Sequence, residues 1–127
     1  MGKYNITKNE LEILRVLWEV GIPLHRGGIL ENSKEKTWKD SSIHILLNKM
    51  MEKGLLKESG FSRSGKVWAR LYAPAFTVEE YYISLFNSIP PSHKTNLLMT
   101  IIAQEHLELE DIASIENMLH VKKESLT

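Results

Sequence analysis

A helical periodicity dominates the stretch from Trp38 to Gly54. Its apolar side chains recur at i, i+3, i+4 and i+7, the spacing of one helix face, and they are Ile43, Leu46, Leu47 and Met50. Asp40 stands at an N-cap position and Gly54 at a C′ position, so we expect one helix over 40–53. The opposite face is polar except for Ile45. A solvated face gains nothing from so bulky an apolar side chain, so the pattern indicates a helix that packs by one face and docks by the other.

Two further helices are expected before this one. Thr7 and Glu10 have the spacing of a capping box, and the helix that they begin ends at 21–23, Gly-Ile-Pro. A shorter helix is expected within 24–36. Its Gly-Gly pair at 27–28 is interpreted as a helix start or close backbone packing, because no preceding strand or following Lys-Ser supports a phosphate-binding turn.

After Gly54 the pattern changes to that of a β-hairpin. Strands are expected at 55–59 and 66–73, joined by a loop at 60–65 with glycines at both ends. Three helices followed by a hairpin is the order of a winged helix-turn-helix domain. In such domains the third helix enters the major groove, and the hairpin tip touches the backbone or the minor groove.

The C-terminal part predicts three short amphipathic helices, with Thr77 and Ser92 as N-caps and Pro90-Pro91 as a break. The predicted fold is therefore mainly α with a small β-hairpin: a winged-helix DNA-binding domain over 1–75, followed by a three-helix dimerisation domain over 76–127. Short helices bury their apolar faces poorly alone, so we expect a homodimer. The candidate dimerisation side chains are apolar or aromatic: Tyr81, Tyr82, Leu85, Phe86, Leu97, Leu98, Ile101, Ile112, Ile115, Met118 and Leu119.

Charge is distributed unevenly although the net charge of the 127 residues is zero. Residues 1–73 carry 13 Lys and Arg against 8 Asp and Glu, whereas residues 74–127 carry 3 against 8. The excess of basic residues in 1–73 suggests that this part of the chain faces a polyanion. The alternative is that the charges are distributed unevenly by chance. The absence of cysteine excludes disulfides, thiol catalysis and cysteine-ligated metals. No apolar run approaches the ~18 residues of a membrane span, so we expect no membrane insertion. The absence of cysteine is compatible with a cytoplasmic location.

Candidate DNA contacts lie on the predicted third helix and on the hairpin. Base edges and nearby phosphates suit Ser41, Ser42, His44, Ile45 and Asn48, and phosphates suit Lys39, Lys49, Arg63 and Lys66. Arg26 and Lys36 are further phosphate candidates. The alternative for every one of them is an ordinary solvated surface.

No enzymatic or metal site is expected. The acidic residues around His106 are interpreted as an acid-rich helix start and not as a metal cluster, and no Ser-His-Asp set or P-loop is present. The sequence therefore predicts no catalytic residue, metal or cofactor.

The chain resembles the penicillinase repressors of the BlaI/MecI type, a family that also includes copper-responsive repressors. Three segments carry the resemblance: 6–19 in the first helix, 38–55 around the third helix, and Tyr72-x-Pro74 after the hairpin. The resemblance implies a homodimeric cytosolic repressor that binds a pseudo-palindromic DNA operator, with a membrane sensor-protease as a possible partner.

This chain departs from the family pattern at three points. Ile45 stands where the family commonly has threonine, which removes a hydroxyl and leaves methyl contact to thymine. The Asn-Phe dipeptide at which penicillinase repressors are cleaved is replaced by 99–102, Met-Thr-Ile-Ile. Either a protease cuts another bond or proteolysis does not induce this member. Copper sensing through cysteine ligands is excluded.

A second function stays open from the sequence alone. Winged helices also serve as protein–protein interaction modules, and the mixed polar and apolar face of the third helix, with neutral net charge, suits that role as well. Sequence-specific, salt-sensitive DNA binding is the property that would separate the two.

Overall fold

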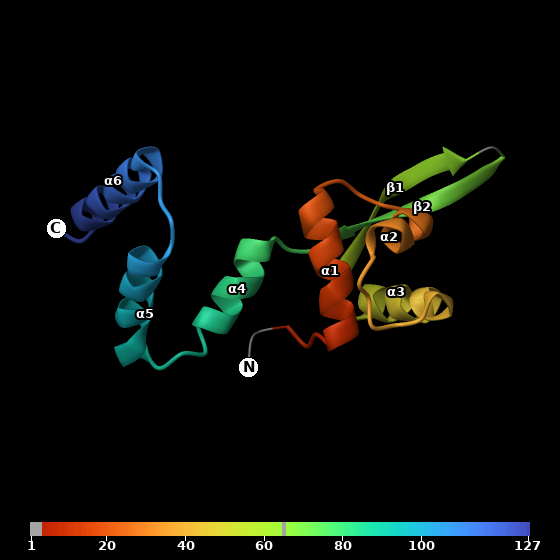
Figure 1. The fold of residues 1–127 in the computed structure, drawn as a ribbon, viewed down its shortest axis with the longest axis horizontal. Helices are drawn as coiled ribbons and strands as arrows, with labels where there is room; N and C mark the ends of the chain where they lie inside the picture. The colour runs from red at the N-terminus through yellow and green to blue at the C-terminus, as the bar shows by residue number, and fades with distance from the viewer. Residues whose placement is uncertain (1–3, 65) are drawn as a thin grey trace. The chain divides into compact units, whose positions relative to one another are not determined.

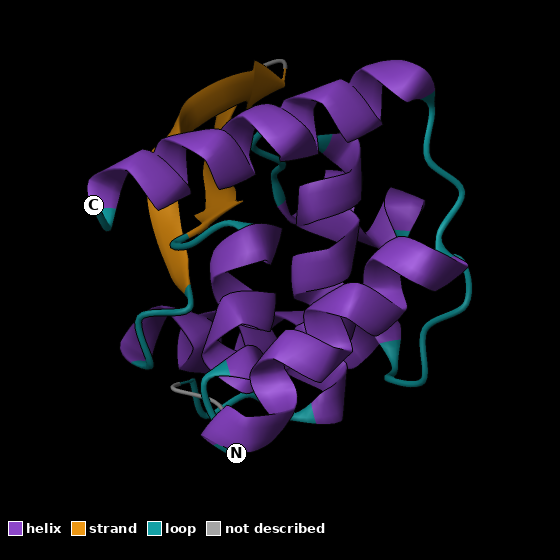
Figure 2. Ribbon diagram, turned by 90° about the vertical axis from the view of Figure 1, so that its left-hand side faces the viewer, coloured by secondary structure: helices purple, strands orange, loops and turns teal. Residues whose placement is uncertain are grey.

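The computed structural model describes residues 4–64 and 66–127. Figure 1 shows the order of the elements in this part of the chain, and Figure 2 shows that helices form most of it, with one β-hairpin. The helices and strands are α1 (Lys8–Val20), α2 (Arg26–Asn32), the 3₁₀ turn η1 (Asp40–Ser42), α3 (Ile43–Glu52), β1 (Leu56–Ser64), β2 (Val67–Pro74), α4 (Val78–Phe86), α5 (Pro91–Gln104) and α6 (Leu109–Ser125). No helix within the described ranges is both long and apolar enough to cross a membrane.

Helix α1 begins with the predicted capping box. The Glu10 amide donates to Thr7 Oγ1 at 3.3 Å, and the Thr7 amide donates to Glu10 Oε1 at 2.9 Å. Both bonds satisfy amides that a helix start leaves without intrahelical partners. The same reciprocal arrangement joins Thr77 and Glu80 at the start of α4, so this predicted cap is confirmed too.

The predicted helix 40–53 is divided into η1 and α3. Asp40 does not act as its N-cap, because α3 begins only at Ile43 and has no side-chain cap, while the Asp40 carboxylate pairs with Lys36. The predicted end is confirmed, since Gly54 has φ of 75°, a left-handed conformation that glycine adopts without a steric penalty.

The hairpin is longer than predicted. Antiparallel pairing continues past the expected strand end to the Arg63–Trp68 and Ser64–Val67 pairs, so most of the expected loop is strand, and residue 65 lies outside the described part. The register is irregular between Glu58 and Phe61, where Gly60 takes φ of 92°. At the base of the hairpin, Leu24 and Tyr72 exchange backbone hydrogen bonds of 3.0 and 2.8 Å.

One apolar cluster joins the three helices to the hairpin. Its buried members are Ile13, Leu14, Leu17, Ile29, Trp38, Ile43, Leu47, Met50, Leu55, Leu56 and Phe76. The indole of Trp18 lies at its edge and donates to the Phe76 carbonyl oxygen at 3.0 Å. This cluster fixes the inner face of α3, and the order of three helices and a hairpin confirms the predicted winged helix-turn-helix class.

The chain forms two compact units that divide after Ser88, whereas the sequence places the boundary after residue 75. Helix α4 belongs to the first unit because the Tyr81 and Trp18 rings lie 5.7 Å apart. A functional division into DNA-binding and dimerisation domains stays a prediction.

The second unit comprises α5 and α6. Helix α5 begins at Pro91 with Pro90 before it, so Ser92 is not its N-cap as predicted. Proline suits a first helical position, where its missing N–H costs nothing. Helix α6 starts with a capping box between Glu108 and Asp111, which confirms the acid-rich helix start.

Candidate nucleic-acid interface

The outer side of α3 and the turn before it carries the side chains that the sequence assigns to DNA. Five of them are exposed and are called here the reading face: Ser41, His44, Ile45, Asn48 and Lys49. Ile45 is 70% exposed, although it lies on a helix whose inner face is firmly packed. Ser42 is only half-buried at the junction of η1 and α3, and Lys39 is exposed just before η1.

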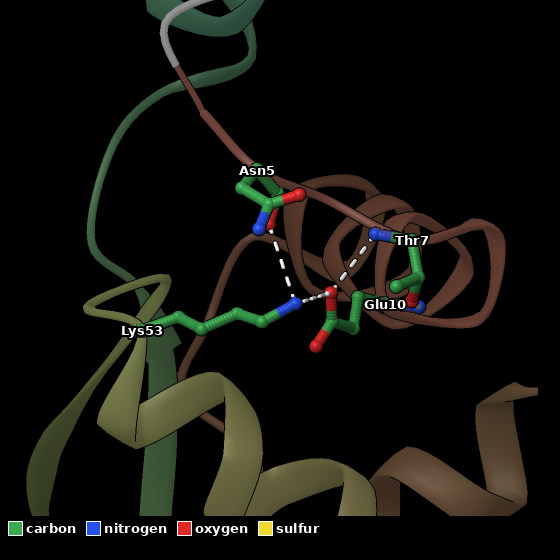
Figure 3. A network of polar contacts seen from close by, with 4 residues as sticks. All are labelled: Asn5, Thr7, Glu10 and Lys53. Atoms are coloured by element: carbon green, nitrogen blue, oxygen red, sulfur yellow. Dashed lines mark hydrogen bonds and ion pairs between the residues drawn. The ribbon is translucent and has the colours of Figure 1, made fainter.

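The C-terminal end of α3 is tied to the start of α1 by Lys53. Figure 3 shows its ammonium between two acceptors, Glu10 Oε1 at 2.8 Å and the Asn5 carbonyl oxygen at 3.4 Å. The Glu10 side chain is 1% exposed and also accepts from the Thr7 amide. Burial by itself raises the pKa of Glu10, but the hydrogen bonds from Lys53 and Thr7 and the Lys53 charge outweigh it, so the pKa lies below its ordinary value.

The segment that leads into α3 is held by α1. Thr37 donates its amide to Glu12 Oε1 at 3.0 Å and its hydroxyl to Glu12 Oε2 at 2.6 Å. The hydroxyl hydrogen bond is the main reason that the pKa of Glu12 is lowered. Trp38 follows in the core, 6% exposed. Both ends of α3 are therefore attached to α1, which gives the reading face a fixed orientation.

The start of α2 approaches the reading face. The guanidinium of Arg26 is in hydrogen-bond contact with the imidazole of His44, and both side chains are exposed. Arg26 is thereby placed beside α3 and not in a separate surface region. His25 caps α2 by accepting from the Gly28 amide at 3.0 Å.

The hairpin carries the predicted cations Arg63 and Lys66, and both are exposed. The Arg63 guanidinium carbon lies 5.7 Å from the centre of the Trp68 ring, its cross-strand partner. Arg70 pairs with Glu58 at 3.2 Å.

Exposed apolar side chains were missed as candidates on the hairpin: Phe61, Val67 and Trp68. The sequence of β2 contained a signal that could have identified Trp68, because side chains alternate between the two faces of a strand. Trp68, Arg70 and Tyr72 share one face of the strand, and only Tyr72 is near enough to the core to pack against it. Trp68 lies four residues beyond Tyr72 on that face, so it is too distant from the core to be there for packing.

A groove of 670 Å³ lies between the start of α2, α3 and the hairpin, and it is called here the wing groove. Its lining residues are His25, Arg26, Gly27, Leu30, His44, Phe61, Val67, Trp68, Ala69, Arg70 and Tyr72. Among these described residues there is no Asp or Glu. Of the sequence-predicted DNA contacts, the groove brings in His44 and the further phosphate candidate Arg26.

The predicted dimerisation residues are divided between the two units. In α4, Tyr81 packs against Trp18, Tyr82 is exposed, and Leu85 and Phe86 are half-buried. The structure describes every residue of α5 and α6, and no side chain of these two helices is buried. Leu97 and Ile115 are half-buried there, and the exposed candidates are Leu98, Ile101, Ile112, Met118 and Leu119.

Similarity to solved structures is weak. One point mutant of ZitR from Lactococcus lactis is 17% identical, with a TM-score of 0.47 over 100% of this chain and 80% of that one. A second ZitR point mutant is 13% identical, with a TM-score of 0.40 over 98% of this chain and 80% of that one.

Sequence similarity is stronger. An uncharacterized 16.5 kDa protein from the ptsI 3′ region of Latilactobacillus sakei is 28% identical over 117 residues, which are 92% of this chain and 80% of the relative. The model of the penicillinase repressor family matches residues 6–121, nearly the whole chain. The chain therefore belongs to the penicillinase repressor family, and it is a transcriptional repressor and not an enzyme.

Proposed function

We propose that the protein represses transcription as a homodimer that binds a pseudo-palindromic operator through α3 and the hairpin. The observation that carries this proposal is the reading face. It combines an exposed Ile45 with amide, imidazole and ammonium groups, on a helix whose other face is held in the core. Such a mixed face suits the major groove, which presents donors, acceptors and thymine methyl groups.

Sequence recognition is assigned to the middle of α3. Asn48 can form two hydrogen bonds with the edge of adenine, and Ile45 can contact a thymine methyl group. Ser41, Ser42 and His44 are placed nearer the start of the helix, where base edges and phosphates are both within reach.

Affinity is assigned mainly to phosphate contacts by Lys39, Lys49, Arg63 and Lys66. All four side chains are exposed, and they lie in the part of the chain that carries the positive balance of charge. Each neutralised phosphate releases counterions, so binding should weaken steeply as salt rises.

Dimerisation is assigned to the exposed apolar side chains of α5 and α6, with Tyr82 of α4. Helices that bury nothing within their own unit leave an apolar surface in contact with water, and such a surface marks an interface. A two-fold dimer would present two copies of α3 to half-sites spaced by one helical turn or a multiple of it.

A mobility-shift titration with the promoter of the protein's own gene tests the proposal. We expect a salt-sensitive shift that survives an excess of random-sequence duplex, together with a dimeric mass in light scattering. Absence of any salt-sensitive shift at micromolar dimer would overturn operator binding through α3 and the hairpin and favour the protein-interaction alternative. A monomeric mass would overturn the dimer.

Induction by a sensor-protease also belongs to this proposal, with one restriction. Because 99–102 is Met-Thr-Ile-Ile, a protease would cut at a bond other than Asn-Phe. A gene for a membrane sensor-protease next to this one is the observation that would support such a circuit.

A further inference from the structure

We infer that the wing groove holds one strand of the operator, with Phe61 and Trp68 against its sugars and Arg26 against a phosphate. This inference rests on the proposed DNA-binding function. It adds a strand clamp made of residues that have no part in reading bases.

The topology of the double helix supports this placement. When α3 occupies the major groove and the hairpin reaches the adjacent minor groove, the strand that separates the two grooves passes between them. The wing groove lies between these two parts of the protein. Arg26 and His44 form the side near α3, whereas Phe61 and Trp68 belong to the hairpin, which projects beyond α2 in Figure 1.

The charge of the lining is complementary to a phosphate backbone. The groove contains the guanidinium groups of Arg26 and Arg70 and the imidazoles of His25 and His44, and none of its described lining residues is acidic. Two other hollows of the first unit differ in this respect. One includes Glu79 and Glu80 in its lining, and the other includes Glu12 and Glu35.

Arg26 is the side chain best placed for a phosphate. Arg70 already pairs with Glu58, whereas the contact that the structure gives to Arg26 is with the ring of His44. A guanidinium has five N–H donors, so the His44 contact holds Arg26 in place and leaves donors for phosphate oxygens.

The apolar part of the lining would contact carbon atoms of the ligand and not its phosphates. Trp68 is 61% exposed and Phe61 52% exposed, and they lie on the part of the hairpin that extends past the core. Deoxyribose offers carbon atoms that can pack against aromatic rings, and the phosphates carry charge, so the backbone of a duplex covers both the apolar and the basic part of this lining. Arg63 lies over the Trp68 ring and orients it from the opposite strand.

Three substitutions test the clamp on two DNAs, the protein's own promoter and a random-sequence duplex. Trp68→Ala should weaken binding to both about tenfold, since contacts between the indole and the sugars carry no information on base sequence. Its salt dependence should stay that of the parent. Arg26→Ala should lower the slope of log affinity against log salt by about one, as the loss of a phosphate contact does. Ile22→Ala removes an apolar side chain of 63% exposure outside the groove and should change neither quantity.

Tryptophan fluorescence gives a second readout. Trp68→Phe keeps an aromatic ring, so it should bind DNA nearly as well as the parent. The fluorescence change that the parent shows on binding should be largely lost in this variant, because Trp18 and Trp38 belong to the core and its edge.

The outcomes separate the clamp from the function on which it rests. If the parent binds DNA while Trp68→Ala and Arg26→Ala both retain its affinity and salt slope, the clamp is overturned and the repressor proposal stands. If the parent shifts neither DNA, both fall. Circular dichroism and thermal melting of each variant should match the parent, and a variant that fails this check is replaced by Trp68→Gln or Arg26→Gln in the same comparison.

Discussion

Lys53 Nζ lies 2.8 Å from Glu10 Oε1, and this ion pair joins the residue after α3 to the first turn of α1. The two residues are 43 positions apart in the sequence. The Glu10 carboxylate is almost completely buried, and among the described residues Lys53 is the only cation paired with it. The Lys53 ammonium therefore neutralises a negative charge that water does not reach. Because the pair connects the end of α3 to α1, it fixes the orientation of α3 and also stabilises the fold.

Loss of the Lys53 ammonium should destabilise the fold strongly. Lys53→Ala leaves the Glu10 carboxylate buried without its cation, and breaking a buried pair in this way costs about 3 kcal/mol. Urea unfolding measures the free energy of unfolding directly. Lys57→Ala, at an exposed position on β1, is the matched control and should stay within about 0.5 kcal/mol of the parent. Equal stability of the two variants would contradict the assigned role of the pair.

The stability should depend on pH in a defined direction. The pKa of Glu10 is lowered in the folded protein relative to its ordinary value of 4.5, so the stabilisation is complete above that value and is lost as the pH falls through 4.5 and below. Urea titrations across this range measure the slope. Glu10→Gln should reduce the slope without abolishing it, because the pKa of Glu12 is lowered as well. A parent-like slope in this variant would exclude Glu10 as the source.

Ile45→Thr should change operator preference and leave the fold intact. The side chain is 70% exposed, so its replacement should alter stability by less than about 0.5 kcal/mol. The new hydroxyl can donate or accept at a base edge where the apolar side chain cannot. Selection of bound sequences from a random duplex library should give different preferred sites for the parent and the variant. Identical sites would remove Ile45 from the set of reading residues.

Asn48→Ala should lose sequence preference and retain most nonspecific affinity. Loss of one bidentate contact to adenine costs about 1–3 kcal/mol of discrimination against the wrong base. The measurement is the ratio of affinities for the own-promoter fragment and a random duplex. Glu19→Ala, exposed near the end of α1, serves as the control. A variant as selective as the parent would show that the reading face is assigned wrongly.

Met118→Glu should dissociate the proposed dimer. A charge at an exposed apolar position of α6 would be buried without a partner if that surface forms an interface. Light scattering at micromolar protein should show the monomer mass, and operator affinity should fall because two half-sites no longer bind together. Ser114→Glu, at an exposed polar position of the same helix, tests whether any new charge on α6 has this effect. An unchanged dimer in Met118→Glu would place the interface elsewhere.

Local signals in the sequence predicted most of the fold. The Thr7–Glu10 and Thr77–Glu80 capping boxes depend on residues three apart, and the left-handed turn at Gly54 depends on a single residue. These features do not require knowledge of distant contacts, so a pattern in the sequence is sufficient to find them.

Some predictions failed because a residue had another interaction partner or because the backbone took another local conformation. Asp40 was expected to cap the helix, but its carboxylate pairs with Lys36 and the chain enters α3 through a 3₁₀ turn. Ser92 was displaced as a cap by Pro91 in the first turn. Gly60 was interpreted as the start of a loop, whereas its left-handed conformation accommodates an irregularity within a continuing strand.

The candidate site was predictable only in part, because some of its contacts join residues that are far apart in the sequence. The period of α3 was enough to identify Ile45 and Asn48 as outward-facing. The Arg26–His44 contact and the wing groove join segments brought together by tertiary packing, and no local pattern encodes that approach.

The irregularity between Glu58 and Phe61 divides the hairpin into two parts with different local stability. The inner part is held by buried Leu56 and by the Leu24–Tyr72 hydrogen bonds, whereas the outer part has mostly exposed side chains. The outer amides can therefore open and exchange hydrogen with solvent while the core stays folded. A DNA strand in the wing groove would close this opening, so part of the binding free energy is used to order the hairpin.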